Sequence, residues 1–200
     1  MKAGEPFSDE LERWLRTDDD KTLGGLSEVF GERSFAVTIV LLMILPATPL
    51  PTGGITHVFE VITVLLGLEL VIGRKTIWLP NRWKRRKLGA TTTDKAIPTI
   101  IKLIRKVERF SRPRGVRVFT NSVGMRLIGV VVIVFAVAAA VAPPFTGLDT
   151  LPALGAVIAA LSIILQDVVV LGVGVAVGAG GIALILTIGA ALYKGVTSLF

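Results

Sequence analysis

Residues 127–193 read LIGVVVIVFAVAAAVAPPFTGLDTLPALGAVIAALSIILQDVVVLGVGVAVGAGGIALILTIGAALY and carry only two formal charges, on Asp149 and Asp167. A soluble domain cannot bury so long an apolar run without polar residues at helix or strand spacing, whereas a lipid bilayer accepts it. Of the 200 residues in the chain, 52% are hydrophobic. The sequence therefore predicts a membrane protein and excludes a soluble enzyme, a disordered regulator and a conventional nucleic-acid-binding domain.

This second membrane region, 127–193, divides into three apolar stretches, over 127–142, about 149–166 and 168–193. The last stretch is long enough to cross a bilayer with some tilt. Within it, Gly174 and Gly178 have the small-xxx-small spacing of a face that packs against another helix. A dinucleotide-binding loop is disfavoured because the required glycine spacing and a βαβ context are both missing. Residues 194–200 are expected to form a short tail.

An earlier apolar region, 34–73, is interrupted by prolines and glycines. These residues break helices, so we expect one helix over 35–45 and a second over 55–72. The first helix is short for a full span and is either extended from upstream residues or re-entrant. The predicted break residues are Pro46, Pro49, Pro51, Gly53 and Gly54 here, and Pro143, Pro144 and Gly147 in the later region.

The two apolar regions resemble each other at an offset of 93 positions, which aligns Pro51 with Pro144 and Gly54 with Gly147. This similarity suggests an internal repeat of two Pro/Gly-interrupted hairpins. Transporters build binding sites from paired broken helices of this kind. Two plain helical hairpins with tight turns at the membrane surface explain the pattern slightly better.

A basic segment, 74–126, separates the two regions and holds 16 of the 22 Lys and Arg residues. Cytoplasmic loops carry an excess of basic residues, so this segment is expected in the cytoplasm of a multi-pass inner-membrane protein. The polar segment 1–33, with short amphipathic helices, is then cytoplasmic as well. The fold predicted is all-α, with about five apolar membrane segments.

Within the basic segment, residues 95–110 separate apolar and basic side chains onto two faces of one helix. We expect this amphipathic helix to lie in the membrane interface and to contact anionic phospholipids. A helix packed on its own domain is the less favoured alternative. The predicted contacts to lipid phosphates are Lys95, Lys102, Arg105, Lys106 and Arg109.

Acidic side chains in or beside the apolar helices need a partner or a water-filled cavity. His57 and Glu60 are three residues apart and share one helical face. If the two hairpins face each other, both residues could line a polar pocket with Asp149. Asp149 is more simply explained as the cap of the helix that follows it, whereas Glu60 has no such explanation. Asp167 is expected at the surface.

The sequence provides no basis for a cofactor, a metal site or a catalytic centre. It has no cysteine and one histidine, so thiolate zinc sites, iron–sulfur sites and histidine clusters are disfavoured. We expect a protein that is not an enzyme and does not bind nucleic acid.

Several short segments occur along the chain in a recognisable order and spacing: Gly31-Glu32-Arg33, 45–51, Gly54, Gly73-Arg74, Trp78-Leu79-Pro80, Val107-Glu108-Arg109-Phe110, Arg112-Pro113-Arg114, 143–147 and Thr150-Leu151-Pro152-Ala153. Together they resemble the ExoD family of exopolysaccharide-synthesis membrane proteins over about residues 22–193. Val168 departs from the family pattern, since glycine usually follows the Gln166-Asp167 pair, and the loop 90–94 is unusual.

This resemblance implies a bacterial inner-membrane protein linked to exopolysaccharide production and, in some relatives, to alkaline tolerance. It supplies no catalytic residues. The favoured function is accessory to exopolysaccharide synthesis or export, with the exopolysaccharide machinery or a second copy of the chain as candidate partners. A small transporter or ion exchanger using Glu60 is the alternative. An enzyme acting on a lipid-linked sugar is the least favoured.

Overall fold

The computed structural model describes residues 6–17, 21–48, 55–78, 84–85, 87–89, 91–143 and 146–197. Its regular elements are all helical, which confirms the all-α prediction, and within these ranges β-pairing is limited to two isolated bridges. In chain order the elements are α1 Phe7–Arg16, α2 Leu23–Phe30, α3 Glu32–Met43, α4 Ile55–Ile72, the π-helix η1 Thr92–Ala96, α6 Ile97–Glu108, α7 Val116–Thr120, α8 Ser122–Val141, α9 Thr150–Leu165 and α10 Val168–Thr197.

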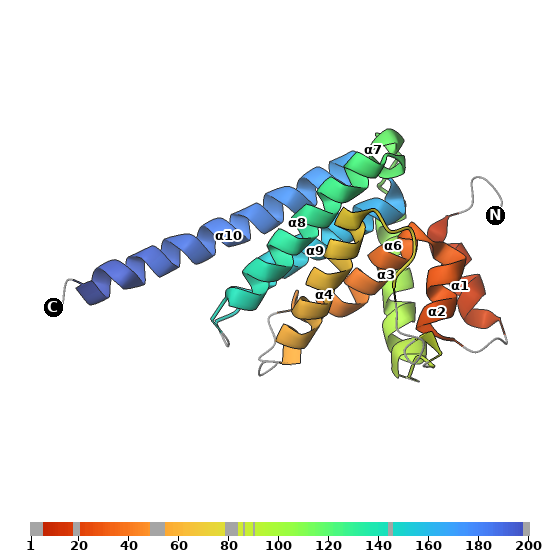
Figure 1. Cartoon of the computed structure of the whole chain (residues 1–200), viewed down its shortest axis with the longest axis horizontal. Helices are drawn as coiled ribbons and strands as arrows, with labels where there is room; N and C mark the ends of the chain where they lie inside the picture. The colour runs from red at the N-terminus through yellow and green to blue at the C-terminus, as the bar shows by residue number, and fades with distance from the viewer. Residues whose placement is uncertain are drawn as a thin grey trace.

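Helices α3, α4, α8 and α9 form a closed ring, in which α3 and α8 each pack against both α4 and α9. Helices α3 and α8 run in one direction and α4 and α9 return (Figure 1). Arg126, near the start of α8, lies beside Gly73, which follows the end of α4. The starts of α3 and α8 and the ends of α4 and α9 therefore lie at the same end of the ring. We call this the basic end, because it carries Arg33, Arg74 and Arg126, and the opposite end the hairpin end.

Helices α4 and α9 stop in the same way at the basic end. Gly73 follows α4 with a φ of 89°, and Gln166 follows α9 with a φ of 51°. A left-handed residue after the last turn is a common helix stop, and glycine is its usual occupant. Gln166 is the one non-glycine residue of the described chain with a positive φ. Its side chain is therefore kept at a backbone position that disfavours it.

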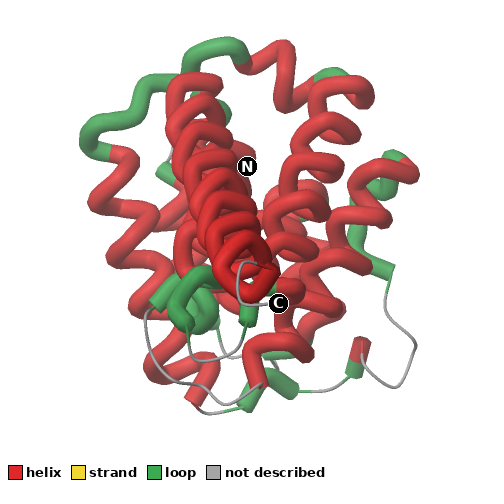
Figure 2. The backbone as a smooth tube through the Cα atoms, turned by 90° about the vertical axis from the view of Figure 1, so that its left-hand side faces the viewer, coloured by secondary structure: helices red, strands yellow, loops and turns green. Residues whose placement is uncertain are grey.

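Helix α10 packs along α9 through small residues. A Cβ added to Gly155 of α9 would lie 2.5 Å from the Cα of Gly178, and one added to Gly174 would lie 2.8 Å from the backbone nitrogen of Ala159. The predicted Gly174 and Gly178 face thus contacts α9. The far half of α10 projects beyond the other helices (Figures 1 and 2).

Two described helices are long and apolar enough to cross a membrane, α8 over Ser122–Val141 and the Val168–Ala191 part of α10. Only 17% of the α10 window is buried within the protein. Helix α9 is apolar but shorter. Length and composition therefore support two membrane segments, and the other three expected segments remain a prediction.

Helices α1, α2 and α6 pack together at one side of the ring. The apolar face of α6, with Ile97, Ile100 and Ile104, is buried in the same core as Phe7 and Leu11 of α1. The prediction that this face lies in the membrane interface is wrong, because protein covers it. The side chains that cover the apolar face of α6 come from segment 1–33, which is mainly polar in sequence. Phe110, at the end of the predicted amphipathic helix, is 83% exposed.

The predicted breaks agree with the helix ends where the structure describes them. Helix α3 ends at Met43, before Pro46, and α8 ends at Val141, before Pro143. Gly147 has a φ of 69° shortly before α9 begins. Residues 194–197 continue α10 instead of forming a tail. Pro49, Pro51, Gly53, Gly54 and Pro144 lie outside the described residues.

Candidate functional site

Near the hairpin end, α4 holds a polar pair inside the ring. The Nδ1 atom of His57 lies 2.8 Å from Oε2 of Glu60, one helical turn later. The Glu60 side chain is 0% exposed, and its Oε1 atom has no hydrogen-bond partner among the described residues. Thr56 and Thr63 are buried on the same face of α4. The helix therefore buries a polar stripe in which one carboxylate oxygen remains available.

Asp149 lies at the hairpin end, close enough for its charge to act on Glu60. It occupies the N-cap position of α9, but its side chain makes no capping hydrogen bond. The hydroxyl of the next residue, Thr150, is buried without a partner among the described residues. The structure thus brings His57 and Glu60 into contact and places Asp149 near them, while the expected capping bond is missing.

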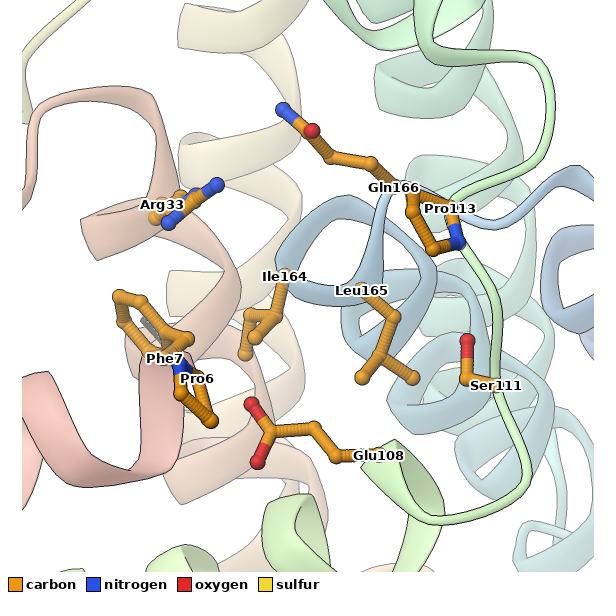
Figure 3. A pocket seen from close by; sticks show the side chains of 9 residues that line it. All are labelled: Pro6, Phe7, Arg33, Glu108, Ser111, Pro113, Ile164, Leu165 and Gln166. Carbon is orange, nitrogen blue, oxygen red and sulfur yellow. The ribbon is translucent and has the colours of Figure 1, made fainter. Parts of the chain in front are cut away.

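A second site lies at the basic end, where a pocket of about 440 Å³ opens between four parts of the chain. This volume is within the usual range of small-ligand pockets. In Figure 3, Arg33 and Gln166 lie toward the upper edge and Glu108 toward the lower edge, with Ile164 and Leu165 between them. The lining residues are Pro6, Phe7, Arg33, Glu108, Ser111, Pro113, Ile164, Leu165 and Gln166.

The two charged side chains of the pocket differ in how fully they are bonded. Glu108 accepts hydrogen bonds from the backbone nitrogen of Ser8, at 3.2 Å, and from the Ser8 hydroxyl. The guanidinium of Arg33 lies 5.4 Å from the ring centroid of Phe7, and its ion pair with Glu10 is long, at 3.9 Å. The Glu108 carboxylate therefore has hydrogen-bond partners, whereas the N–H groups of Arg33 make no hydrogen bond within the described chain.

Asp167 lies beside this pocket, and its expected position at the surface is wrong, because the side chain is buried. Its carboxylate accepts hydrogen bonds from the Ser111 hydroxyl at 2.8 Å and from the backbone nitrogens of Val169 and Arg112 at 2.9 and 3.2 Å. Burial alone would raise the pKa of Asp167, but these hydrogen bonds and the charge of Arg114 hold it below its usual range. Through these hydrogen bonds, Asp167 connects the loop that contains Ser111 and Arg112 to the start of α10.

The basic face of α6 is only partly free for lipid. Arg105 donates to Asp9 at 2.9 Å and to Glu12 at 2.6 Å, so it is less available for the predicted contact with lipid phosphate, which stays a prediction. The hydrogen bonds from Arg105 and then Arg16 lower the pKa of Glu12, and the bonds to Glu12 and then Asp9 raise that of Arg105. The other predicted contacts, Lys95, Lys102, Lys106 and Arg109, are exposed.

The pocket at the basic end is a site that the sequence patterns did not predict. Its polar residues, Arg33, Glu108, Ser111 and Gln166, come from separate segments, and no spacing relates them along the chain. One feature of the sequence could have indicated the pocket. At the repeat offset of 93 positions, Gln166 occupies the position that corresponds to Gly73. Within the described residues no group of His, Cys, Asp or Glu could hold a metal ion.

The fold and these two sites define a helical protein with membrane-capable helices, a buried carboxylate at one end and an Arg-lined pocket at the other. The family model described as exopolysaccharide synthesis, ExoD, matches residues 7–187, and the chain belongs to this family.

Two relatives show how far the similarity extends. Uncharacterized protein slr1875 of Synechocystis is 25% identical over 171 residues, which cover 84% of this chain and 80% of the relative. Protein ExoD of Rhizobium meliloti is 32% identical over 96 residues, 46% of this chain and 38% of that protein. No solved structure matches the chain.

Proposed function

We propose that this chain is a multi-pass inner-membrane protein that is accessory to exopolysaccharide synthesis or export and performs no catalysis itself. The family match over residues 7–187 carries this proposal, because the family is described by exopolysaccharide synthesis. The apolar side chains that α10 exposes support insertion into a bilayer, where lipid would cover them. Neither the family description nor the relatives' names mention alkaline tolerance, which stays a prediction.

In the proposed topology the basic end faces the cytoplasm and the hairpin end faces outward. The basic excess in 74–126 supports this orientation. An internal repeat is also part of the proposal. It is supported by the packing of α3 on α9 and of α4 on α8, and by the matching left-handed stops at Gly73 and Gln166. Exopolysaccharide machinery or a second copy of the chain remain the proposed partners.

Deletion and complementation test the accessory role. A source strain that lacks the chain should secrete less exopolysaccharide, and the wild-type chain should restore the yield. Cells should keep normal pools of the sugar precursors, because an accessory protein does not make them. Unchanged polymer yield in the deletion strain would contradict the proposal.

A small ion or proton exchanger is the second candidate, and Glu60 favours it. A carboxylate that is 0% exposed and has one oxygen without a partner can take up a proton or a cation inside the ring. The neighbouring His57 is partly exposed, so it offers a route toward the outer water.

Glu60→Gln separates the two functions. In proteoliposomes under a pH gradient, an exchanger should lose at least about 90% of its ion flux, because the amide cannot titrate. Glu69→Gln is the matched control on the same helix and should keep the flux. If the wild type conducts nothing and Glu60→Gln restores polymer yield fully, the exchanger function is excluded and the accessory role stands.

A further inference from the structure

The pocket at the basic end gathers segments that are far apart in the sequence. Arg33 begins α3, Glu108 ends α6, Pro113 belongs to the loop before α7, and Gln166 ends α9 (Figure 3). Segments 6–7, 33, 108–113 and 164–166, which are far apart along the chain, therefore supply one pocket.

Gln166 is the first observation that points to a ligand. It adopts φ 51° and ψ 39°, a left-handed backbone conformation that disfavours non-glycine residues. The equivalent stop of α4 uses Gly73, for which this conformation is not strained. The Gln166 side chain lines the pocket and is partly exposed, so its amide is open to solvent or to a ligand in the pocket. We take the strained backbone position as a sign that this side chain has a role in the pocket.

Arg33 is the second observation. The guanidinium lies over the Phe7 ring at the pocket and forms a long ion pair with Glu10, and its N–H groups make no hydrogen bond within the described residues. A planar guanidinium held in this way recognises oxyanions with two parallel hydrogen bonds. Ser8 at the start of α1 hydrogen-bonds the Glu108 carboxylate but leaves its negative charge, so an anion in the pocket must be held by Arg33 against this charge. Three exposed cations, Arg109, Arg112 and Arg114, adjoin the lining residues in the chain.

We propose that this pocket binds the phosphate of an anionic, phosphate-bearing headgroup, with Arg33 as the charged ligand and Gln166 as a second donor. Ile164 and Leu165 provide an apolar floor for the carbon atoms beside the phosphate. The pocket lies where α9 ends and α10 begins, which is the level of lipid headgroups in the proposed orientation. The site is independent of the Glu60 site and of the accessory role.

Calorimetric titration of the full chain in an uncharged detergent tests the proposal. The ligands are dioctanoyl-phosphatidylglycerol, dioctanoylglycerol, which lacks the phosphate, and inorganic pyrophosphate. The first should bind and the second should not. Saturable binding of pyrophosphate as well would identify the soluble phosphate group as sufficient, whereas binding of the lipid alone would identify a membrane headgroup as the source.

Three variants assign the site. Arg33→Gln should weaken phosphate binding about tenfold, because a charge-assisted pair is lost. Gln166→Gly should weaken it about fivefold and also raise the thermal midpoint by a few degrees, because glycine relieves the backbone strain. Arg117→Gln, the control, removes an exposed charge at the same end and should change binding less than about twofold.

Four results would overturn the proposal. The first is that neither phosphate ligand binds, and the second is that dioctanoylglycerol binds as tightly as the phospholipid. The third is that Arg117→Gln weakens binding as much as Arg33→Gln, which would indicate unspecific attraction. The fourth is that Gln166→Gly raises the thermal midpoint but leaves binding unchanged, which would remove Gln166 from the site.

Discussion

At the scale of residues, Glu60 and Asp167 are two buried carboxylates with opposite surroundings. Asp167 accepts hydrogen bonds from Ser111, Arg112 and Val169, so its charge is satisfied within the protein. Glu60 has one oxygen bonded to His57 and one without a partner among the described residues. We infer that Asp167 stabilises the fold, whereas Glu60 retains the capacity to bind a proton or an ion.

Asp167→Asn should lower the free energy of unfolding by about 1–3 kcal/mol near pH 7, because charged hydrogen bonds are lost. The folded pKa of Asp167 is below its unfolded value of about 3.9. Its contribution is therefore fully present above about pH 4 and is lost as pH falls through the folded pKa. Thermal unfolding in detergent at several pH values should show a weaker acid dependence for this variant than for the wild type.

Asp149→Asn is the control for this experiment. The Asp149 side chain makes no capping bond and is only half-buried, so its replacement should change stability little. The assignment of Asp167 as structural fails if both variants follow the wild-type pH profile.

At the scale of elements, the sequence predicted helices well but not always what covers them. The bounds of α4 agree with the predicted 55–72, and Gly73, in a left-handed conformation, ends the helix. For α6, the separation of faces predicted an apolar surface correctly. It could not show whether lipid or protein covers that surface, because the covering residues Phe7 and Leu11 lie about 90 positions away.

The contact between α9 and α10 gives a prediction for matched glycines. Gly155→Ala should destabilise the protein by about 1–3 kcal/mol, because the added Cβ would lie 2.5 Å from the Cα of Gly178 and 3.0 Å from the carbonyl oxygen of Gly174. Gly180→Ala has nothing within 4 Å and should be neutral or slightly stabilising. Thermal unfolding in one detergent compares the two. Equal effects would mean that α10 does not pack on α9 through these residues.

At the scale of the whole molecule, the composition and the two Pro/Gly-interrupted regions predicted an all-helical protein. The pocket at the basic end could not be predicted, because Arg33, Glu108 and Gln166 are brought together only by the closed ring and by α6. The burial of Asp167 depends on the same assembly, since its partners Ser111 and Arg112 belong to a different segment. Local sequence patterns predict single helices, whereas a site formed between helices can be located only when the fold is known.

The central claim is that the ring lies in a membrane with its basic end in the cytoplasm. The chain has no cysteine, so single cysteines can report the side on which a position lies. Thr120, which ends α7 and lies next to the start of α8 at the basic end, and Thr146 at the hairpin end are both exposed. Each is replaced by cysteine, one at a time, for labelling with a membrane-impermeant thiol reagent.

In intact cells, or in spheroplasts if an outer membrane is present, Thr146→Cys should be labelled. Thr120→Cys should be labelled only after the membrane is permeabilised. Labelling of Thr120→Cys from outside would contradict the orientation, and protection of both positions until permeabilisation would contradict the membrane-spanning ring itself.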